Sequence, residues 1–162
     1  MARMRLVLTV MALCLYLVGC FGEQQPVLEF SDMPALAEKG DAETQCVVGL
    51  MYHDGIEVKQ DYAEAAKWYR KAGEQGDAEA QLSLGLMYGI GNGVKQNVVT
   101  AYAWHNIAAT AAHNRTPRQR RARDKAKGER AVLTKKMTPE DISKAQALSK
   151  EMIKKNPKLI NN

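Results

Sequence analysis

The sequence is poor in the residues that build disulfide frameworks, metal sites and common catalytic centres. Two of its three cysteines, Cys14 and Cys20, lie in or directly after an N-terminal apolar segment, so the rest of the chain can form no internal disulfide. The three histidines, His53, His105 and His113, lack metal-ligand spacing, and no serine begins an S-x-x-K motif. The sequence therefore predicts no catalytic residue, no metal site and no cofactor.

Long hydrophobic runs are also missing, apart from one at the start of the chain. This run, from Leu6 to Val18, follows two arginines and is too short to cross a bilayer, which needs roughly 20 apolar residues. It predicts a secretory signal peptide. The run ends in Leu17-Val18-Gly19-Cys20, which resembles the lipobox of bacterial lipoproteins. An ordinary signal peptide with an incidental cysteine, or an uncleaved anchor, is the alternative.

The lipobox resemblance implies a signal peptide over residues 1–19 and a lipid on Cys20. Residues 20–29 then form a tether, and the nine residues after the cysteine reach about 30 Å. Phe21, which stands where inner-membrane lipoproteins carry aspartate, favours the outer membrane in a host with two membranes. We therefore expect a lipid-anchored protein of the bacterial cell envelope that faces the periplasm.

An internal repeat dominates the remaining sequence. Residues 40–75 align with residues 76–111 without a gap, and sixteen of the thirty-six positions are identical. Each copy contains two stretches with helical spacing of small and apolar residues, separated by a glycine-containing turn. The turns are followed by Asp61 and Asn97, which are good N-cap residues. Each copy is therefore predicted to be a helix-turn-helix unit.

The identities follow the pattern A-x-x-Q-x-x-x-G-x-x-Y-x-x-G and then V-x-x-(D/N)-x-x-x-A-x-x-W-x-x-x-A. This pattern resembles the Sel-one-like repeat, a branch of the tetratricopeptide-like α/α repeats. The resemblance implies an all-α fold, a short right-handed α-solenoid whose units bury their apolar faces by stacking. It also implies a protein-binding adaptor or regulator. The paired cysteines of some secreted relatives are absent, so packing alone must stabilise the fold.

The repeat region is predicted to span residues 30–111, with a partial leading helix over residues 30–39. Glu57 stands where the second copy has Gly93, which predicts a different turn in the first copy. Residues 112–162 are predicted to form a basic helix and a C-terminal capping helix, because each segment begins with Thr-Pro. The last helix places four residues on one face, which suits a cap over the final repeat: Ile142, Ala145, Leu148 and Met152.

The first helix of each repeat is expected to line the concave face of the solenoid. A mostly apolar groove there suits a peptide or helix from another envelope protein. Several of the candidate residues could instead fill the core between repeats. The predicted partner-binding residues are Thr44, Val47, Val48, Met51, Ala80, Ser83, Leu84 and Met87.

A second candidate surface is basic. Residues 112–136 contain ten Lys or Arg against two acidic residues, a local balance of +8. This segment could meet anionic lipid headgroups or an acidic protein, or could be a solvated face without a dedicated partner. The export signal disfavours nucleic acid. The predicted basic surface consists of Arg118, Arg120, Arg121, Arg123 and Lys127.

Together these patterns predict an envelope-anchored, non-enzymatic adaptor or regulator that binds protein through its repeats. Two alternatives remain open at this point. One is a cell-wall enzyme acting on β-lactam or peptidoglycan substrates, against which the missing S-x-x-K motif argues. The other is a protein that binds peptidoglycan or anionic lipid through the basic helix.

Overall fold

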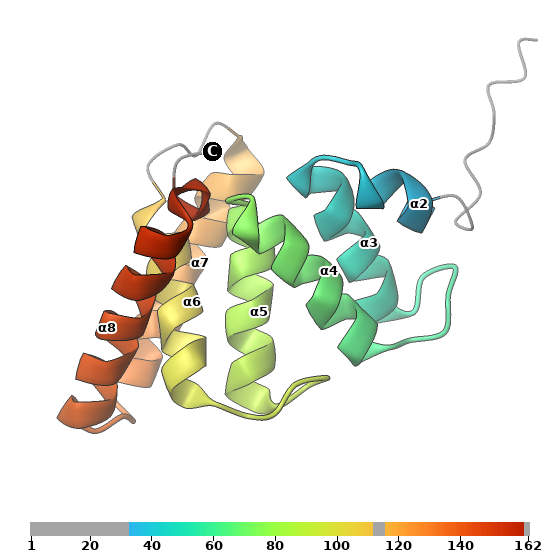
Figure 1. The fold of residues 1–162 in the computed structure, drawn as a ribbon. Helices are drawn as coiled ribbons and strands as arrows, with labels where there is room; N and C mark the ends of the chain where they lie inside the picture. Colours follow the sequence, from blue (N-terminus) through green and yellow to red (C-terminus); the bar gives the residue numbers. More distant parts are fainter. Residues whose placement is uncertain (1–32, 112–115, 161–162) are drawn as a thin grey trace, which may run out of the picture.

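The structure is a computed structural model that describes residues 33–111 and 116–160. Within these ranges the chain is entirely helical, with no strand, which confirms the all-α prediction (Figure 1). Consecutive helices pair into antiparallel hairpins that stack along the molecule. The helices are α2 (Met33–Glu38), α3 (Ala42–Asp54), α4 (Tyr62–Glu74), α5 (Ala78–Ile90), α6 (Val98–Thr110), α7 (Pro117–Thr134) and α8 (Pro139–Lys155), followed by the 3-10 helix η2 (Pro157–Leu159).

Short polar side chains fix where the helices of the two repeats begin. The Asp61 carboxylate accepts hydrogen bonds from the backbone N–H groups of Ala63 and Glu64, at 2.8 and 3.0 Å. Asn97 plays the same part at the start of α6, where its side-chain oxygen accepts from Thr100 at 3.0 Å. These contacts satisfy N–H groups that would otherwise lack partners in the first helical turn. The predicted N-caps are thus confirmed.

The turns inside the two repeats have the same backbone conformation, contrary to the prediction. Gly93 has φ +66°, and Glu57 at the equivalent place has φ +61°. A left-handed backbone is unfavourable for a residue with a Cβ atom, but the surrounding hairpin imposes it on Glu57. The repeat geometry therefore overrides the local preference of glutamate.

Two glycines allow the helices of each hairpin to approach closely. A Cβ atom on Gly49 would lie 2.7 Å from the Tyr69 ring, and one on Gly85 would lie 2.4 Å from the His105 ring. Real Cβ atoms do not come so close to other atoms, so each ring occupies the space that its glycine leaves free. His105 is 2% exposed and fills, in the second repeat, the position that Tyr69 fills in the first.

α2 takes the place before α3 that α4 takes before α5. The Gln45 side chain donates to the Ala37 carbonyl at 2.9 Å, and the Gln81 side chain donates to the Gly73 carbonyl at the same distance. The two acceptors lie thirty-six positions apart, so the joint between α2 and α3 repeats the joint between α4 and α5. The described part of α2 runs from Met33, and residues 30–32 of the predicted helix lie outside the described residues.

α7 and α8 both pack on α6 and extend the stack beyond the second repeat (Figure 1). Ala145 lies on the buried side of α8, as predicted. The chain then turns back through η2, where Leu159 is 2% exposed in the core that it shares with Trp104 and Ile107. The Gln81 side chain donates to the Leu159 carbonyl at 2.8 Å, so the end of the described chain closes the joint between the two repeats.

Candidate functional site

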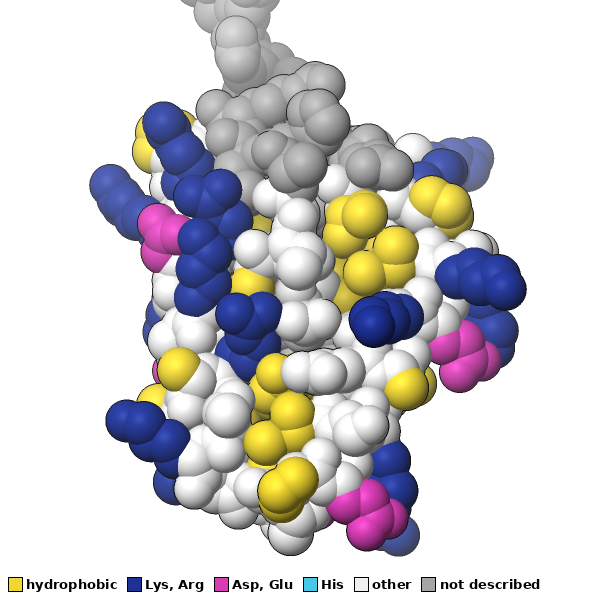
Figure 2. Space-filling view, turned by 90° about the vertical axis from the view of Figure 1, so that its left-hand side faces the viewer, with side chains coloured by type: hydrophobic (Ala, Val, Ile, Leu, Met, Phe, Trp, Pro, Cys, Tyr) yellow, Lys and Arg dark blue, Asp and Glu magenta, His cyan; other side chains and the backbone are white. Residues whose placement is uncertain are grey.

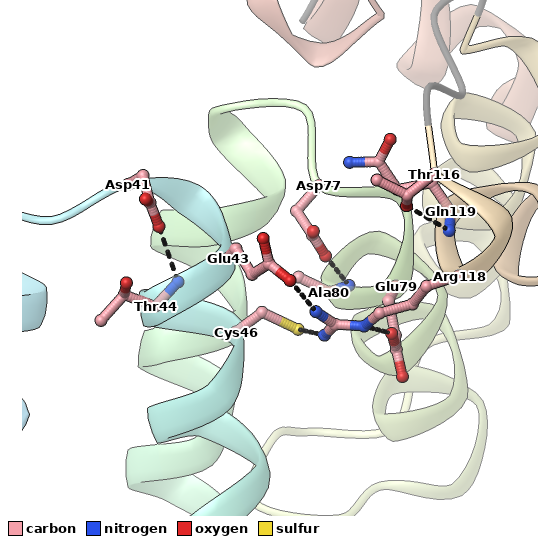
Figure 3. Close-up of polar contacts among 10 residues, drawn as sticks. All are labelled: Asp41, Glu43, Thr44, Cys46, Asp77, Glu79, Ala80, Thr116, Arg118 and Gln119. Carbon is pink, nitrogen blue, oxygen red and sulfur yellow. Dashed lines mark hydrogen bonds and ion pairs between the residues drawn. The ribbon is translucent and has the colours of Figure 1, made fainter.

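The first helices of the three hairpins follow one another in the order α3, α5 and α7, and Arg118 links their N-terminal ends (Figure 3). On α3 and α5 the solvent-facing residues recur at intervals of four, three and four positions, which is one stripe along an α-helix. We call this surface the first-helix face. Its stripes consist of Glu43, Val47, Leu50 and Asp54 on α3, and of Glu79, Ser83, Leu86 and Ile90 on α5.

Half of the predicted partner-binding residues are not on this face but in the core. Val48, Ala80 and Leu84 are fully buried, and Met87 is 2% exposed. Val48 packs with Ala37 and Trp68, whereas the other three join the cluster around Tyr69 and Trp104. For these four residues the alternative interpretation, that they fill the core between repeats, is therefore correct. The half-buried residues are Thr44, Val47, Met51 and Ser83, and their contact with a partner stays a prediction.

Sequence reasoning placed the accessible stripe about a quarter turn away from its true position. It missed Leu50, Leu86 and Ile90, because α5 carries apolar residues on nearly every side and its pattern does not single out an exposed face. One signal was available. Asp54 stands where the second repeat has Ile90, and a position that is charged in one copy is unlikely to face the core in the other.

The apolar part of the first-helix face is unusually open. Ile90 is 66% exposed and Leu50 is 41% exposed, although both are large aliphatic side chains. Leu86 is half-buried and packs against the cluster of buried residues that α5 shares with α7, including Leu82 and Ala122. We call these three aliphatic residues the apolar strip; Leu50 lies on α3, and Leu86 and Ile90 lie on α5.

A single arginine from α7 links all three first helices at their N-terminal ends. The Arg118 guanidinium donates to the Glu79 carboxylate of α5, and its Nη1 lies 3.3 Å from the Glu43 carboxylate of α3 (Figure 3). Its Nη2 lies 3.2 Å from the Cys46 Sγ. Glu43, Glu79 and Arg118 are each the second residue of their helix, so the third hairpin places a cation where the two repeats carry carboxylates.

This contact cluster favours the charged form of Arg118 and the neutral form of Cys46. Burial disfavours the charge on Arg118, but the hydrogen bond to Glu79 and the neighbouring carboxylates outweigh that cost and raise its pKa. Burial, reinforced by the nearby Asp77, raises the pKa of the Cys46 thiol far above its usual range. The thiol is therefore neutral at physiological pH and is not a nucleophile. The arrangement serves recognition and packing better than covalent chemistry.

Beside Arg118 a shallow pocket of about 250 Å³ opens between α5 and α7. Leu82 and Ala122 line it with apolar surface and are almost fully buried. Arg121 and Lys125 line its α7 side, are exposed, and take part in none of the ion pairs or hydrogen bonds between the described residues. The pocket thus combines apolar walls with two cations that pair with none of the described residues.

The predicted basic residues fall on different sides of α7. At 3.6 residues per turn, Arg120 and Lys127 lie about half a turn away from Arg118. Arg123 and Lys127 lie 3.4 and 3.3 Å from the Asp124 carboxylate. Arg118 therefore differs from Arg123 and Lys127, because it binds carboxylates of other helices whereas these two pair within α7. Figure 2 views the end formed by α7 and α8, where Lys and Arg side chains flank exposed hydrophobic ones.

Residues 33–111 and 116–160 hold neither a candidate metal cluster nor a candidate membrane-spanning helix. No group of three or more His, Cys, Asp or Glu residues in these ranges is placed to hold a metal ion. No helix in the same ranges has the length and apolar character needed to cross a bilayer. Cys20, His113 and the predicted signal peptide and tether lie outside the described residues.

Comparisons with known proteins agree with the geometry. The sequence model of the Sel1 repeat matches residues 42–77 and 78–113, and Sel1 repeat proteins generally mediate protein–protein interactions. No curated protein sequence matches the chain.

Two solved structures resemble the fold. One is c5321, a protective antigen of uropathogenic Escherichia coli strains that displays an SLR fold; it is 34% identical, with a TM-score of 0.68 over 78% of this chain and 26% of that one. The other is a Sel1 repeat protein from Oxalobacter formigenes, 31% identical, with a TM-score of 0.52 over 77% of this chain and 45% of that one. The chain spans less than half the length of either protein. It is an α-solenoid built around two Sel1 repeats, at residues 42–77 and 78–113.

Proposed function

We propose that this protein is a non-enzymatic adaptor of the bacterial envelope, and that its first-helix face binds a segment of another protein. The observation that carries the proposal is the exposed apolar strip of Leu50, Leu86 and Ile90. Side chains of this size lose favourable free energy while they face water, at roughly 25 cal/mol per Å² of apolar surface. A partner that covers them recovers that free energy.

The form of the strip favours a short segment as the partner. Its aliphatic side chains lie on neighbouring helices within one face, and charged residues border them at Glu43, Asp54 and Lys125. An apolar centre with a polar rim is the usual composition of a protein-binding surface. A helix or extended peptide of the partner can lie along such a strip, with a few apolar anchors supplying most of the affinity.

The test uses paired charge insertions on exposed positions. Leu50→Asp with Ile90→Asp should weaken partner capture at least tenfold without unfolding the protein. Val132→Asp with Ile56→Asp is the matched control, because both residues are 47% exposed but lie outside the strip. Capture is measured in cells with a photoreactive amino acid at Val47 or Ser83, followed by mass spectrometry. Equal crosslinking in both double variants would reject the first-helix face as the binding site.

Lipid attachment at Cys20 is the second part of the proposal, and the lipobox-like Leu17-Val18-Gly19-Cys20 supports it. A lipid there would hold the solenoid at a membrane surface. Cys20→Ser should abolish labelling by a radioactive or clickable fatty acid and move the protein out of the membrane fraction, whereas Cys46→Ser should do neither. Membrane association that survives Cys20→Ser without the label would indicate an uncleaved anchor instead.

A further inference from the structure

We infer that the partner segment is acidic along one edge, and that its carboxylates bind Arg121 and Lys125 at the pocket between α5 and α7. This inference rests on the proposed function and adds the chemistry of the partner. It begins from which Lys and Arg side chains of α7 have a hydrogen-bond or ion-pair partner and which do not. The net charge of the segment does not give this information.

Most cations on the described part of α7 already have partners. Arg118 binds Glu79 and Glu43, and Arg123 and Lys127 share Asp124. Arg130 donates to the Asn106 side chain at 2.7 Å.

The two cations that border the pocket, Arg121 and Lys125, have no such partner within residues 33–111 and 116–160. Glu79 lies on the opposite wall, but its carboxylate is engaged by Arg118, so it does not neutralise them. The positive charge at the pocket is thus available to a ligand.

The spacing of the two cations matches a helical ligand. Arg121 and Lys125 are four residues apart, which corresponds to about 6 Å along a helix axis. A partner helix with carboxylates at positions i and i+4 presents two negative charges at the same spacing. Apolar residues at i+3 and i+7 lie on the adjoining side of such a helix and would meet Leu82 and Leu86. The pocket therefore fits an amphipathic helix with one acidic and one apolar edge.

Charge on the other side of the face fixes the orientation of that helix. Glu43 and Asp54 of α3 are both exposed and would repel an acidic edge. The acidic edge consequently lies over α7 and the apolar edge lies toward Leu50 and Ile90.

A flat anionic membrane fits this site less well than a peptide does. Arg121 and Lys125 line a recess whose opposite wall carries Glu79, and a bilayer surface cannot enter a pocket of about 250 Å³. Lipid headgroups would instead meet the cations on the outer side of α7, such as Arg120 and Lys127. The two kinds of ligand therefore depend on different residues.

The experiment measures binding of a fluorescent model peptide to the full chain. The probe is (Glu-Ala-Ala-Leu)4, compared with (Gln-Ala-Ala-Leu)4 and (Lys-Ala-Ala-Leu)4 at 50 mM salt. Wild type should bind the acidic probe at least tenfold more tightly than the neutral one. Arg121→Glu with Lys125→Glu should remove that preference and favour the basic probe. Arg120→Glu with Lys127→Glu changes the net charge equally and should leave the preference intact.

Three results would overturn the inference. One is an equal loss in both double variants, which would show that only net charge matters. Another is binding to vesicles containing anionic lipid, but not to the acidic probe, that depends on Arg121 and Lys125. The third is crosslinking in cells that requires Leu50 and Ile90 but is indifferent to both charge reversals. The last result would retain the proposed function while rejecting the acidic partner.

Discussion

The two repeats have nearly the same backbone but different chemistry at several equivalent places. Each consists of two helices of 13 residues, and each inner turn contains the same left-handed position. Yet the first repeat buries Tyr69 where the second buries His105, and strains Glu57 where the second has Gly93. The difference shows that the caps, the close-approach glycines and the tryptophans determine the hairpin. The other positions are free to acquire local properties.

Neighbouring structure explains why the same residue behaves differently in the two copies. Trp68 packs with Ala37 and Val48 at the α2 end of the stack, and Lys71 lies 4.2 Å from the centre of its ring. Trp104 is 1% exposed and belongs to the largest core cluster, together with Leu159. The second repeat is covered on both sides by described helices, so its residues are the more deeply enclosed.

The largest effect should come from the turn of the second repeat. A Cβ atom on Gly93 would lie 2.2 Å from the Tyr62 carbonyl group, and its φ of +66° is unfavourable for alanine. Gly93→Ala should therefore cost at least about 3 kcal/mol of unfolding free energy. Gly128→Ala is the control, since a Cβ there meets nothing within 4 Å and helix propensity predicts a gain of up to about 1 kcal/mol. Urea denaturation measures both, and a tolerated Gly93→Ala would contradict the close packing of the turn on α4.

The next largest effect should appear in the pH dependence of stability, where His105 and Tyr69 should differ. Burial lowers the pKa of His105 to about 4, so the folded protein resists a proton that the unfolded chain accepts near pH 6.5. The contribution is constant above pH 6.5, and stability falls by about 2–3 kcal/mol as the pH drops to 4. His105→Phe should remove this part of the acid sensitivity, and Tyr69→Phe should leave it unchanged. An identical pH profile for wild type and His105→Phe would show that His105 is protonated without cost.

A smaller effect should follow from the link that joins the repeats to α7. Arg118→Gln removes the contacts to Glu79 and Glu43, but the Arg118 side chain is 35% exposed and solvent screens much of the interaction. The expected loss is about 1 kcal/mol, reduced in high salt. Arg120→Gln should change stability by less than half of that amount, because Arg120 forms no ion pair among the described residues. Equal values for the two variants would mean that the link adds nothing to stability.

The smallest effect should come from Glu57→Gly, a substitution that makes the first repeat more like the second. Glu57→Gly relieves the left-handed strain, worth about 1–2 kcal/mol, and adds about 0.5–1 kcal/mol of backbone entropy cost. The net gain should be about 0.5–1 kcal/mol by urea denaturation. Glu57→Ala keeps the Cβ atom and should give no comparable gain. A loss of stability in Glu57→Gly would imply that the glutamate side chain makes a contribution larger than the strain.

Local features of the fold could be predicted from the sequence because their determinants lie close together in the chain. The N-cap residues Asp61 and Asn97 could be identified without tertiary information, and so could the thirty-six-residue period. The buried side of α8 shows the limit of this reasoning. Ser149 is fully buried because Asn106, forty-three positions earlier, donates a hydrogen bond to its hydroxyl at 2.9 Å. No local pattern indicates that a polar residue belongs there.

The candidate site was less predictable for a related reason. Which side of α3 and α5 stays exposed depends on what covers the other sides, and Leu84 is covered by the preceding hairpin while Leu86 is not. The number of cations on α7 was evident from the sequence, whereas their availability was not. Asp124 and Glu79 pair with other cations, so Arg121 and Lys125 have no partner in the part of the chain that the structure describes.

The return of the chain through η2 has a consequence for how the protein acquires its fold. In a simple repeat array each unit contacts only its neighbours, so folding can spread along the chain as it is synthesised. Here the Gln81 side chain donates to the Leu159 carbonyl, which lies seventy-eight positions later in the chain. The joint between the two repeats is therefore incomplete until Leu159 is present. When both repeats have been synthesised, Leu159 has not yet been added to the chain. We therefore expect the joint between the repeats to be completed only after the C-terminal helices have emerged.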